Sequence, residues 1–124
     1  MKACVFVAAM LLTAGPALAQ PQTSGDPAAG EKVFNQCKAC HTVQAGQNRV
    51  GPSLHGVVGR KAASVEGFAY SPVMKESGLT WTPENLDKYL TDPKALLPGN
   101  KMAFPGLKKP EDRANVIAYL AQQK

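Results

Sequence analysis

Apolar residues recur at helical spacing in several short segments of the chain, and most of these segments start with a polar capping residue followed by proline. Gly30, Val33, Phe34 and Cys37 follow the i, i+3, i+4, i+7 pattern of an amphipathic helix. A capping residue before proline suits the first turn of a helix, where an acceptor is needed and an N–H is dispensable. No stretch alternates apolar and polar residues for long enough to predict a sheet, so the pattern predicts an all-α fold. The predicted helices span residues 26–40, 71–76, 82–90, 92–97 and 110–122.

The segment between the first two predicted helices has no sustained hydrophobic period. Residues 42–65 contain Gly46, Gly51, Gly56 and Gly59, so we predict an ordered loop rather than a helix or a strand. A loop of this length is uncommon in a small domain unless it has a function, and wrapping a cofactor is one such function.

The N-terminal residues have the features of a secretory signal peptide. Lys2 precedes an apolar run of about ten residues, which is too short to span a membrane, and Ala17-Leu18-Ala19 is a small-x-small pattern that signal peptidase accepts. We therefore predict that residues 1–19 are removed, that residues 20–124 form one domain, and that the mature protein resides in the periplasm. A retained membrane anchor is the alternative.

Composition and charge narrow the possible partners. The formal net charge of +5 predicts an acidic protein partner or an anionic surface. Nucleic acid is not expected, because aromatic and basic residues do not interleave on one evident helix or strand. A small domain with 11 Gly and 10 Pro builds only a modest core from its side chains, so a covalently held cofactor would stabilise it.

The sequence Cys37-Lys38-Ala39-Cys40-His41 is the attachment signature of a c-type haem. Positions i, i+3 and i+4 of a helix share one face, so both thiols can add to the haem vinyl groups while the imidazole ligates the iron. A thioredoxin-like redox pair, a zinc site and a disulfide framework are the alternatives for two cysteines at this spacing. A zinc site needs four ligands, and outside the motif the chain has only Cys4 and His55; the thioredoxin-like alternative expects strands, and none is predicted before the motif.

A haem iron with one histidine ligand has a sixth position, and its occupant decides between an electron carrier and a catalyst. The predicted mature chain offers two methionines. Met74 lies in a short predicted helix, whereas Met102 lies in a loop that turns at both ends and can present its thioether to the iron. Taken alone, a methionine is more often core filler than a ligand.

Blocks of residues from the first helix to the last match the sequence pattern of one known family: residues 30–41, 51–56, 59–61, 67–70, 79–81, 89–90, 92–94, 98–106 and 117–120. In these blocks the chain resembles the class I c-type cytochromes, and within them mitochondrial cytochrome c and the bacterial cytochrome c2 type. The resemblance covers nearly all of the predicted mature chain and implies the class I cytochrome c fold, in which about five helices and long loops wrap one covalently bound haem. Asn100 and Met74 depart from the mitochondrial pattern, which usually has threonine and asparagine there.

The resemblance also implies roles for individual residues. Cys37 and Cys40 would form the thioethers of haem c (heme c), with His41 as the proximal iron ligand and Met102 as the distal one. Pro52 would offer its carbonyl to the free nitrogen of His41 and so fix the ring. The residues implied to hold a haem propionate or to lie near the ligand sulfur are Arg60, Tyr70, Trp81 and Tyr89.

The function implied by the resemblance is that of a soluble, monomeric one-electron carrier and not an enzyme. It would shuttle electrons from a cytochrome bc-type complex to a terminal oxidase or a photosynthetic reaction centre, and would touch the membrane only by transient docking. Redox partners with acidic faces would meet lysines around the exposed haem edge, with Lys32, Lys94, Lys101, Lys108 and Lys109 as candidates. A peroxidase or gas sensor needs an open sixth position and a distal acid–base residue, and the sequence offers neither. His55 matches a surface histidine of the family and is expected to be structural.

Overall fold

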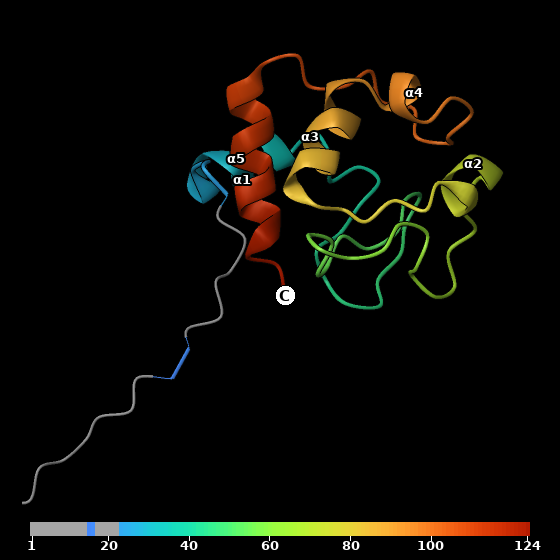
Figure 1. Ribbon diagram of the computed structural model, residues 1–124, viewed down its shortest axis with the longest axis horizontal. Coiled ribbons are helices and arrows are strands. Elements are labelled where there is room, and N and C mark those ends of the chain that lie inside the picture. Colours follow the sequence, from blue (N-terminus) through green and yellow to red (C-terminus); the bar gives the residue numbers. More distant parts are fainter. Residues whose placement is uncertain (1–14, 17–22) are drawn as a thin grey trace, which may run out of the picture.

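The computed structural model describes residues 15–16 and 23–124, and its helices after the first follow the predicted segments closely. In this described part of the chain no strand forms, and only an isolated antiparallel bridge joins Lys61 to Thr80. The fold is therefore all-α, as predicted, whereas the predicted signal peptide lies outside the described residues except for positions 15 and 16. The helices are α1 (Pro27–Phe34), α2 (Pro72–Glu76), α3 (Pro83–Thr91), α4 (Pro93–Leu96) and α5 (Pro110–Ala121), as labelled in Figure 1.

Of the five helices in the described residues, four begin with the predicted combination of a side-chain cap and a proline. Each cap oxygen accepts a hydrogen bond from a backbone N–H two or three residues further on, which satisfies one free donor at the helix start. α5 has no side-chain cap, and acidic Glu111 and Asp112 in its first turn interact favourably with the helix dipole instead. The four capping residues are Asp26, Ser71, Thr82 and Asp92.

The first helix is shorter than the sequence predicted. The prediction extended it to Cys40, but α1 ends at Phe34 and residues 35–40 form successive turns. After Phe34 the backbone bonds reach back three residues, as from Cys37 N–H to Phe34 C=O at 2.8 Å, and this tightens the chain. The prediction was wrong because apolar residues three apart share a face in a tight turn as well as in an α-helix.

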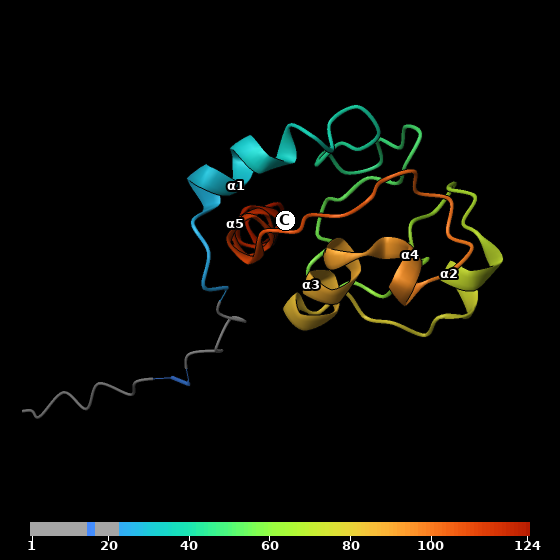
Figure 2. The ribbon, with the colours of Figure 1, turned by 90° about the horizontal axis from the view of Figure 1, so that it is seen from above.

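The first and last helices cross closely at Gly30. A Cβ atom on Gly30 would collide with the carbonyl of Asn115 and with the Cβ of Tyr119, both in α5. The rings of Phe34 and Tyr119 pack with their centroids 5.3 Å apart. Because glycine has no side chain, Gly30 permits this close approach of the two helices. Figures 1 and 2 both show α1 and α5 together at one end of the molecule.

The other end of the molecule holds α2 and α4, with α3 between them and the first pair of helices (Figure 2). α3 packs against both α4 and α5. The contact with α5 includes the nearly buried Arg113, whose Nε donates to the Asp87 carboxylate at 2.7 Å and whose Nη1 donates to the Leu107 carbonyl at 2.9 Å. Because its charge is paired and hydrogen-bonded, this arginine is compatible with burial.

The long loop after the Cys-x-x-Cys-His motif is ordered by its own side chains. Ser53 Oγ donates to the Gln44 carbonyl at 2.6 Å, and Ser53 N–H donates to Asn48 Oδ1 at 2.9 Å. Asn48 Nδ2 in turn donates to the Glu66 carbonyl at 3.2 Å, which ties the two ends of the loop together. The prediction of an ordered loop is confirmed.

Among the described residues, no helix combines the length and apolarity needed to cross a bilayer.

Candidate haem-binding site

Cys37, Cys40 and His41 lie in one turn directly after α1. The N–H groups of Cys40 and His41 both donate to the Cys37 carbonyl, at 3.1 and 2.9 Å, so the three side chains keep the spacing that places them on one face. Both cysteines are free and half-buried. Burial, and then the neighbouring Cys40, raise the pKa of the Cys37 thiol, whereas the attacking cysteine of a thiol–disulfide enzyme has a lowered pKa.

The His41 ring is oriented by the backbone of the long loop. Its Nδ1 lies 2.7 Å from the Pro52 carbonyl oxygen, the contact that the family resemblance implies. Because a carbonyl only accepts hydrogen bonds, Nδ1 carries the proton and Nε2 keeps its lone pair. Burial lowers the pKa of His41, the Pro52 hydrogen bond opposes this, and the charge of Arg60 lowers it further. The ring is therefore a neutral, oriented imidazole with one nitrogen available for a metal.

Arg60 has a buried nitrogen without a partner. Its Nη1 donates to the His55 carbonyl at 2.8 Å, but its Nε has no hydrogen-bond partner among the described residues. Burial also lowers the pKa of Arg60. A buried N–H of a cation is costly to leave unpaired, and a carboxylate is the acceptor that matches it best. A haem propionate would provide that acceptor.

Tyr70, Trp81 and Tyr89 form one group with Arg60. The backbone N–H of Trp81 donates to the Arg60 carbonyl at 2.8 Å, and the Trp81 and Tyr89 rings pack with centroids 4.9 Å apart. Tyr70 is close enough to Arg60 to raise its pKa slightly against the larger effect of burial, and its hydroxyl accepts from Val65 N–H at 3.2 Å. Burial raises the pKa of Tyr89 to about 12. The structure thus brings together four residues that are separated in the sequence.

The two candidate methionines are both half-buried and pack against the core, so burial does not distinguish them. Met74 belongs to α2, where its N–H donates to the Ser71 cap. Met102 lies outside any helix, and its N–H donates to Asn100 Oδ1 at 2.9 Å. In the described part of the chain, neither methionine shares a hydrogen bond with His41 or Arg60.

Many apolar side chains of the loops and short helices are only half-buried although they pack against the core. An apolar macrocycle would cover such side chains and add to the core of this small domain. Together with two free thiols, a neutral imidazole and an unpartnered Arg60 nitrogen, this lining fits a covalently held haem. The half-buried apolar residues include Val43, Leu54, Val58, Val73, Leu79, Leu90, Leu96 and Phe104.

All of the predicted docking lysines are exposed and come from separate parts of the chain. Lys32 lies in the last turn of α1 and Lys94 in α4. Lys101 Nζ donates to the Ala69 carbonyl at 3.3 Å, and Lys108 Nζ donates to the Thr91 carbonyl at 3.0 Å, while Lys109 immediately precedes α5. The described residues contain one ion pair, between Arg113 and Asp87, so no salt bridge neutralises these lysines.

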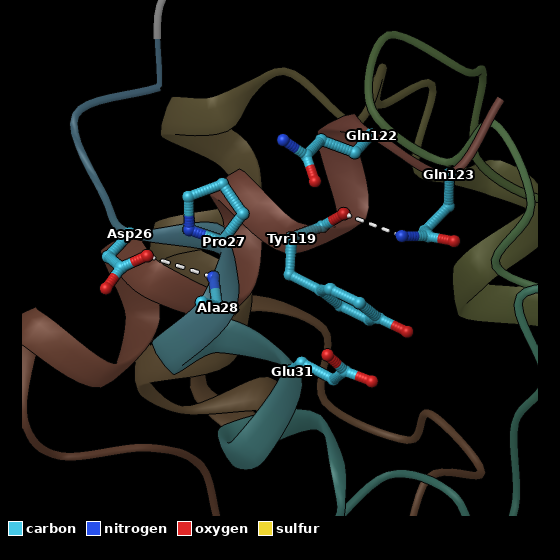
Figure 3. A pocket seen from close by; sticks show the side chains of 7 residues that line it. All are labelled: Asp26, Pro27, Ala28, Glu31, Tyr119, Gln122 and Gln123. Carbon is cyan, nitrogen blue, oxygen red and sulfur yellow. Dashed lines mark hydrogen bonds between the residues drawn. The ribbon is translucent and has the colours of Figure 1, made fainter.

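A separate polar pocket of about 640 Å³ lies between the start of α1 and the end of α5 (Figure 3). Figure 3 shows the side chains of Glu31 and Tyr119 beside each other in it. Burial, and then the Glu31 carboxylate, raise the pKa of Tyr119. None of the predicted haem or docking residues lines this pocket, so it is distinct from the haem site.

Short helices joined by long ordered loops, with a Cys-x-x-Cys-His turn and an oriented imidazole, define a class I c-type cytochrome. The sequence matches the family Cytochrome c over residues 27–124, and the chain belongs to this family. It is 57% identical over 106 residues to cytochrome c2 of Rhodomicrobium vannielii, with 85% of each chain covered. It is 52% identical over 115 residues to cytochrome c-554 of Methylosinus trichosporium, covering 92% of this chain and 84% of that one. The solved structure of cytochrome cH from Methylobacterium extorquens has a TM-score of 0.73 and 52% identity, covering 77% of this chain and 97% of that chain.

Membership of the family settles the cofactor and the class of activity. Cytochromes c carry covalently attached haem c and transfer electrons, so this chain is an electron carrier and not an enzyme. It also confirms the class I cytochrome c fold. The roles of the individual residues described above remain predictions.

Asn48 and Asn100 each make hydrogen bonds that shape a loop, and the sequence did not predict these roles. Asn100 is otherwise distinguished only as a departure from the mitochondrial pattern. For Asn100 the sequence contained a local indication of this role, because Asn100 directly follows Gly99. In the structure Gly99 adopts a turn conformation with a φ of 89°. Asparagine beside such a turn often bonds neighbouring backbone groups.

Proposed function

We propose that the protein is a soluble, exported one-electron carrier of the cytochrome c2 type that works in the periplasm. It would accept electrons from a cytochrome bc-type complex and pass them to a terminal oxidase or a photosynthetic reaction centre. The similarity to bacterial cytochrome c2 chains supports this role. Removal of residues 1–19 would leave residues 20–124 as the mature domain, and mass spectrometry of the exported protein tests this by locating the first residue at Gln20.

The observation that carries the proposal is the orientation of His41. The Pro52 carbonyl holds the proton on Nδ1, which leaves the Nε2 lone pair free to bind a metal. Cys37 and Cys40, one turn away, would attach the vinyl groups, and Met102 would supply the second axial donor. Bound haem c supplies an iron that accepts and releases a single electron. With His41 and Met102 both held to this iron, the chain would leave no position on it for a substrate.

A second group of residues would hold a buried propionate. Arg60 offers an unpartnered Nε–H, and Tyr70 and Trp81 lie in the same group. Tyr89 packs on Trp81 and closes this group toward the core. These side chains would exclude water from the carboxylate and compensate its charge.

Recognition of the partners would depend on the exposed lysines. Contacts between electron-transfer proteins are small, below about 1,200 Å² in total, and charge attraction mainly accelerates their formation. The formal net charge is +5 for the whole chain and +4 once Lys2 is removed with residues 1–19. This positive charge and the five lysines without a salt bridge suit partners with acidic docking faces.

The test is the bimolecular rate of electron transfer from the holoprotein to a purified acidic acceptor, such as a terminal oxidase, at increasing salt. The rate should fall as ionic strength passes about 0.1 M, where the screening length is near 10 Å. Lys94→Glu and Lys101→Glu should slow the reaction more than Lys124→Glu, a matched charge reversal at the C-terminus. Equal slowing by all three variants would leave only net charge and remove the docking face.

A further inference from the structure

The side chain of Asn100 joins α4 to the backbone of Met102. Its Nδ2 donates to the Pro93 carbonyl at 3.0 Å and to the Leu97 carbonyl at 2.8 Å. Its Oδ1 accepts from Met102 N–H at 2.9 Å. One half-buried amide therefore uses both of its donors and its acceptor to connect a short helix to the methionine two residues further on.

The partners of Asn100 on α4 are anchored in the core. Pro93 is among the largest fully buried side chains, and Leu97 is 6% exposed. The Pro93 and Leu97 carbonyls also accept from the backbone N–H groups of Leu97 and Asn100, at 3.0 and 3.1 Å, so the Asn100 amide adds a second donor at each carbonyl. Met102 is thereby held relative to buried residues, although it lies in a segment without helical structure.

The two sides of the Met102 segment are anchored differently. On its C-terminal side, Leu107 N–H donates to the Leu90 carbonyl at 2.6 Å and Arg113 Nη1 donates to the Leu107 carbonyl at 2.9 Å. On its N-terminal side, the remaining bonds are the Asn100 N–H to the Leu97 carbonyl at 3.1 Å and the exposed Lys101 Nζ to the Ala69 carbonyl at 3.3 Å. The Asn100 side chain is therefore the main anchor on the N-terminal side.

We infer that Asn100 is a positioning residue that keeps the segment around Met102 closed and so controls how readily a small external ligand, such as imidazole, replaces the Met102 thioether. In that exchange the iron–sulfur bond breaks and an iron–nitrogen bond to imidazole forms, with no change in oxidation state. The segment must swing away first, which breaks the three side-chain bonds of Asn100. This inference rests on the proposed ligand role of Met102.

The experiment follows imidazole binding to the ferric holoprotein by stopped-flow absorbance. At saturating imidazole, loss of the methionine–iron absorption band reports the rate of segment opening. Asn100→Ala loses all three bonds, and its Met102 segment should open at least about tenfold faster. The net contribution of a single hydrogen bond is close to the free energy that corresponds to a tenfold change in rate. Asn100→Asp keeps the acceptor for Met102 N–H but cannot donate to the Pro93 and Leu97 carbonyls, whose oxygens repel its carboxylate, so its segment should also open faster than that of the natural chain. This variant also keeps the test open if Asn100→Ala does not fold.

The matched control is Asn85→Ala, which removes a bond from Asn85 Nδ2 to the Thr80 carbonyl at 2.8 Å outside the Met102 segment. It should lower the resistance to urea and leave the opening rate within about twofold of the natural chain. Unchanged opening rates in both Asn100 variants, with the absorption band intact, would overturn the inference alone. Survival of the band in Met102→Ala would instead overturn the proposed ligand, so the two failures are distinguishable.

Discussion

His41 Nδ1 lies 2.7 Å from the carbonyl oxygen of Pro52, and this single bond determines which nitrogen of the ring can meet a metal. The acceptor is a backbone atom, so no substitution of the Pro52 side chain removes it directly. A substitution at the neighbouring Gly51 can disturb this hydrogen bond instead, because a Cβ atom there would collide with the imidazole ring of His41.

Gly51→Ala should displace the His41 ring and weaken its ligation of the iron. We expect a lower yield of holoprotein and an altered low-spin absorption spectrum, because covalent attachment, ligation and folding are coupled in so small a domain. Ala45→Leu, which adds bulk at an exposed position of the same loop, should leave the spectrum unchanged. A natural spectrum in Gly51→Ala would mean that the loop moves aside and does not fix the ring.

Met102→Ala should abolish the methionine–iron absorption band and allow the reduced protein to bind carbon monoxide, because a sixth position is opened. Met74→Leu should keep the band and remain unreactive, since it replaces a half-buried side chain of α2 with one of similar volume. Absorption spectra of both variants with and without carbon monoxide make the comparison. If Met74→Leu loses the band and binds carbon monoxide while Met102→Ala keeps the band, Met74 is the ligand.

Gly30→Ala should destabilise the protein by about 1–3 kcal/mol, because its new methyl group overpacks the crossing of α1 and α5 against Asn115. The intrinsic preference for alanine in a helix acts in the opposite direction, so a loss would come from the crossing itself. Urea unfolding of the holoprotein measures the change. Ala28→Val adds bulk at an exposed position of the same helix and should change stability by less than about 0.5 kcal/mol. Equal stability of Gly30→Ala and the natural chain would show that the helices separate at little cost.

The raised pKa of Tyr89 predicts a loss of stability at alkaline pH. Burial raises the pKa of Tyr89 to about 12, whereas an unfolded tyrosine has a pKa near 10. The unfolded chain therefore loses this proton first, so stability is fully present below about pH 10 and falls as the pH rises toward 12. At pH 11 the loss amounts to about 1.4 kcal/mol.

Tyr89→Phe lacks the ionisable hydroxyl and should not show this part of the alkaline loss. Urea unfolding of both proteins at pH 9 and pH 11 gives the difference, because other titrating groups contribute equally to the two chains. A constant difference between the proteins at the two pH values would show that water reaches the hydroxyl in the folded state.

The sequence alone determined the features that depend on neighbours in the chain. Four capped proline starts and the apolar spacing of α5 located the helices, because local backbone geometry and side-chain period are set by residues a few positions apart. The Cys37 to His41 motif identified the cofactor for the same reason, since its spacing acts within a single turn.

Only the tertiary structure decided which of several possible hydrogen-bond partners each group takes. The end of α1 at Phe34, the buried and unpartnered Nε of Arg60, and the attachment of Asn100 to α4 and Met102 could not be read from local pattern. Each depends on which groups packing brings within hydrogen-bond distance, and a side chain such as Asn100 has many local partners in the unfolded chain. Burial then selects one set, because a polar group removed from water must find its partners inside the fold.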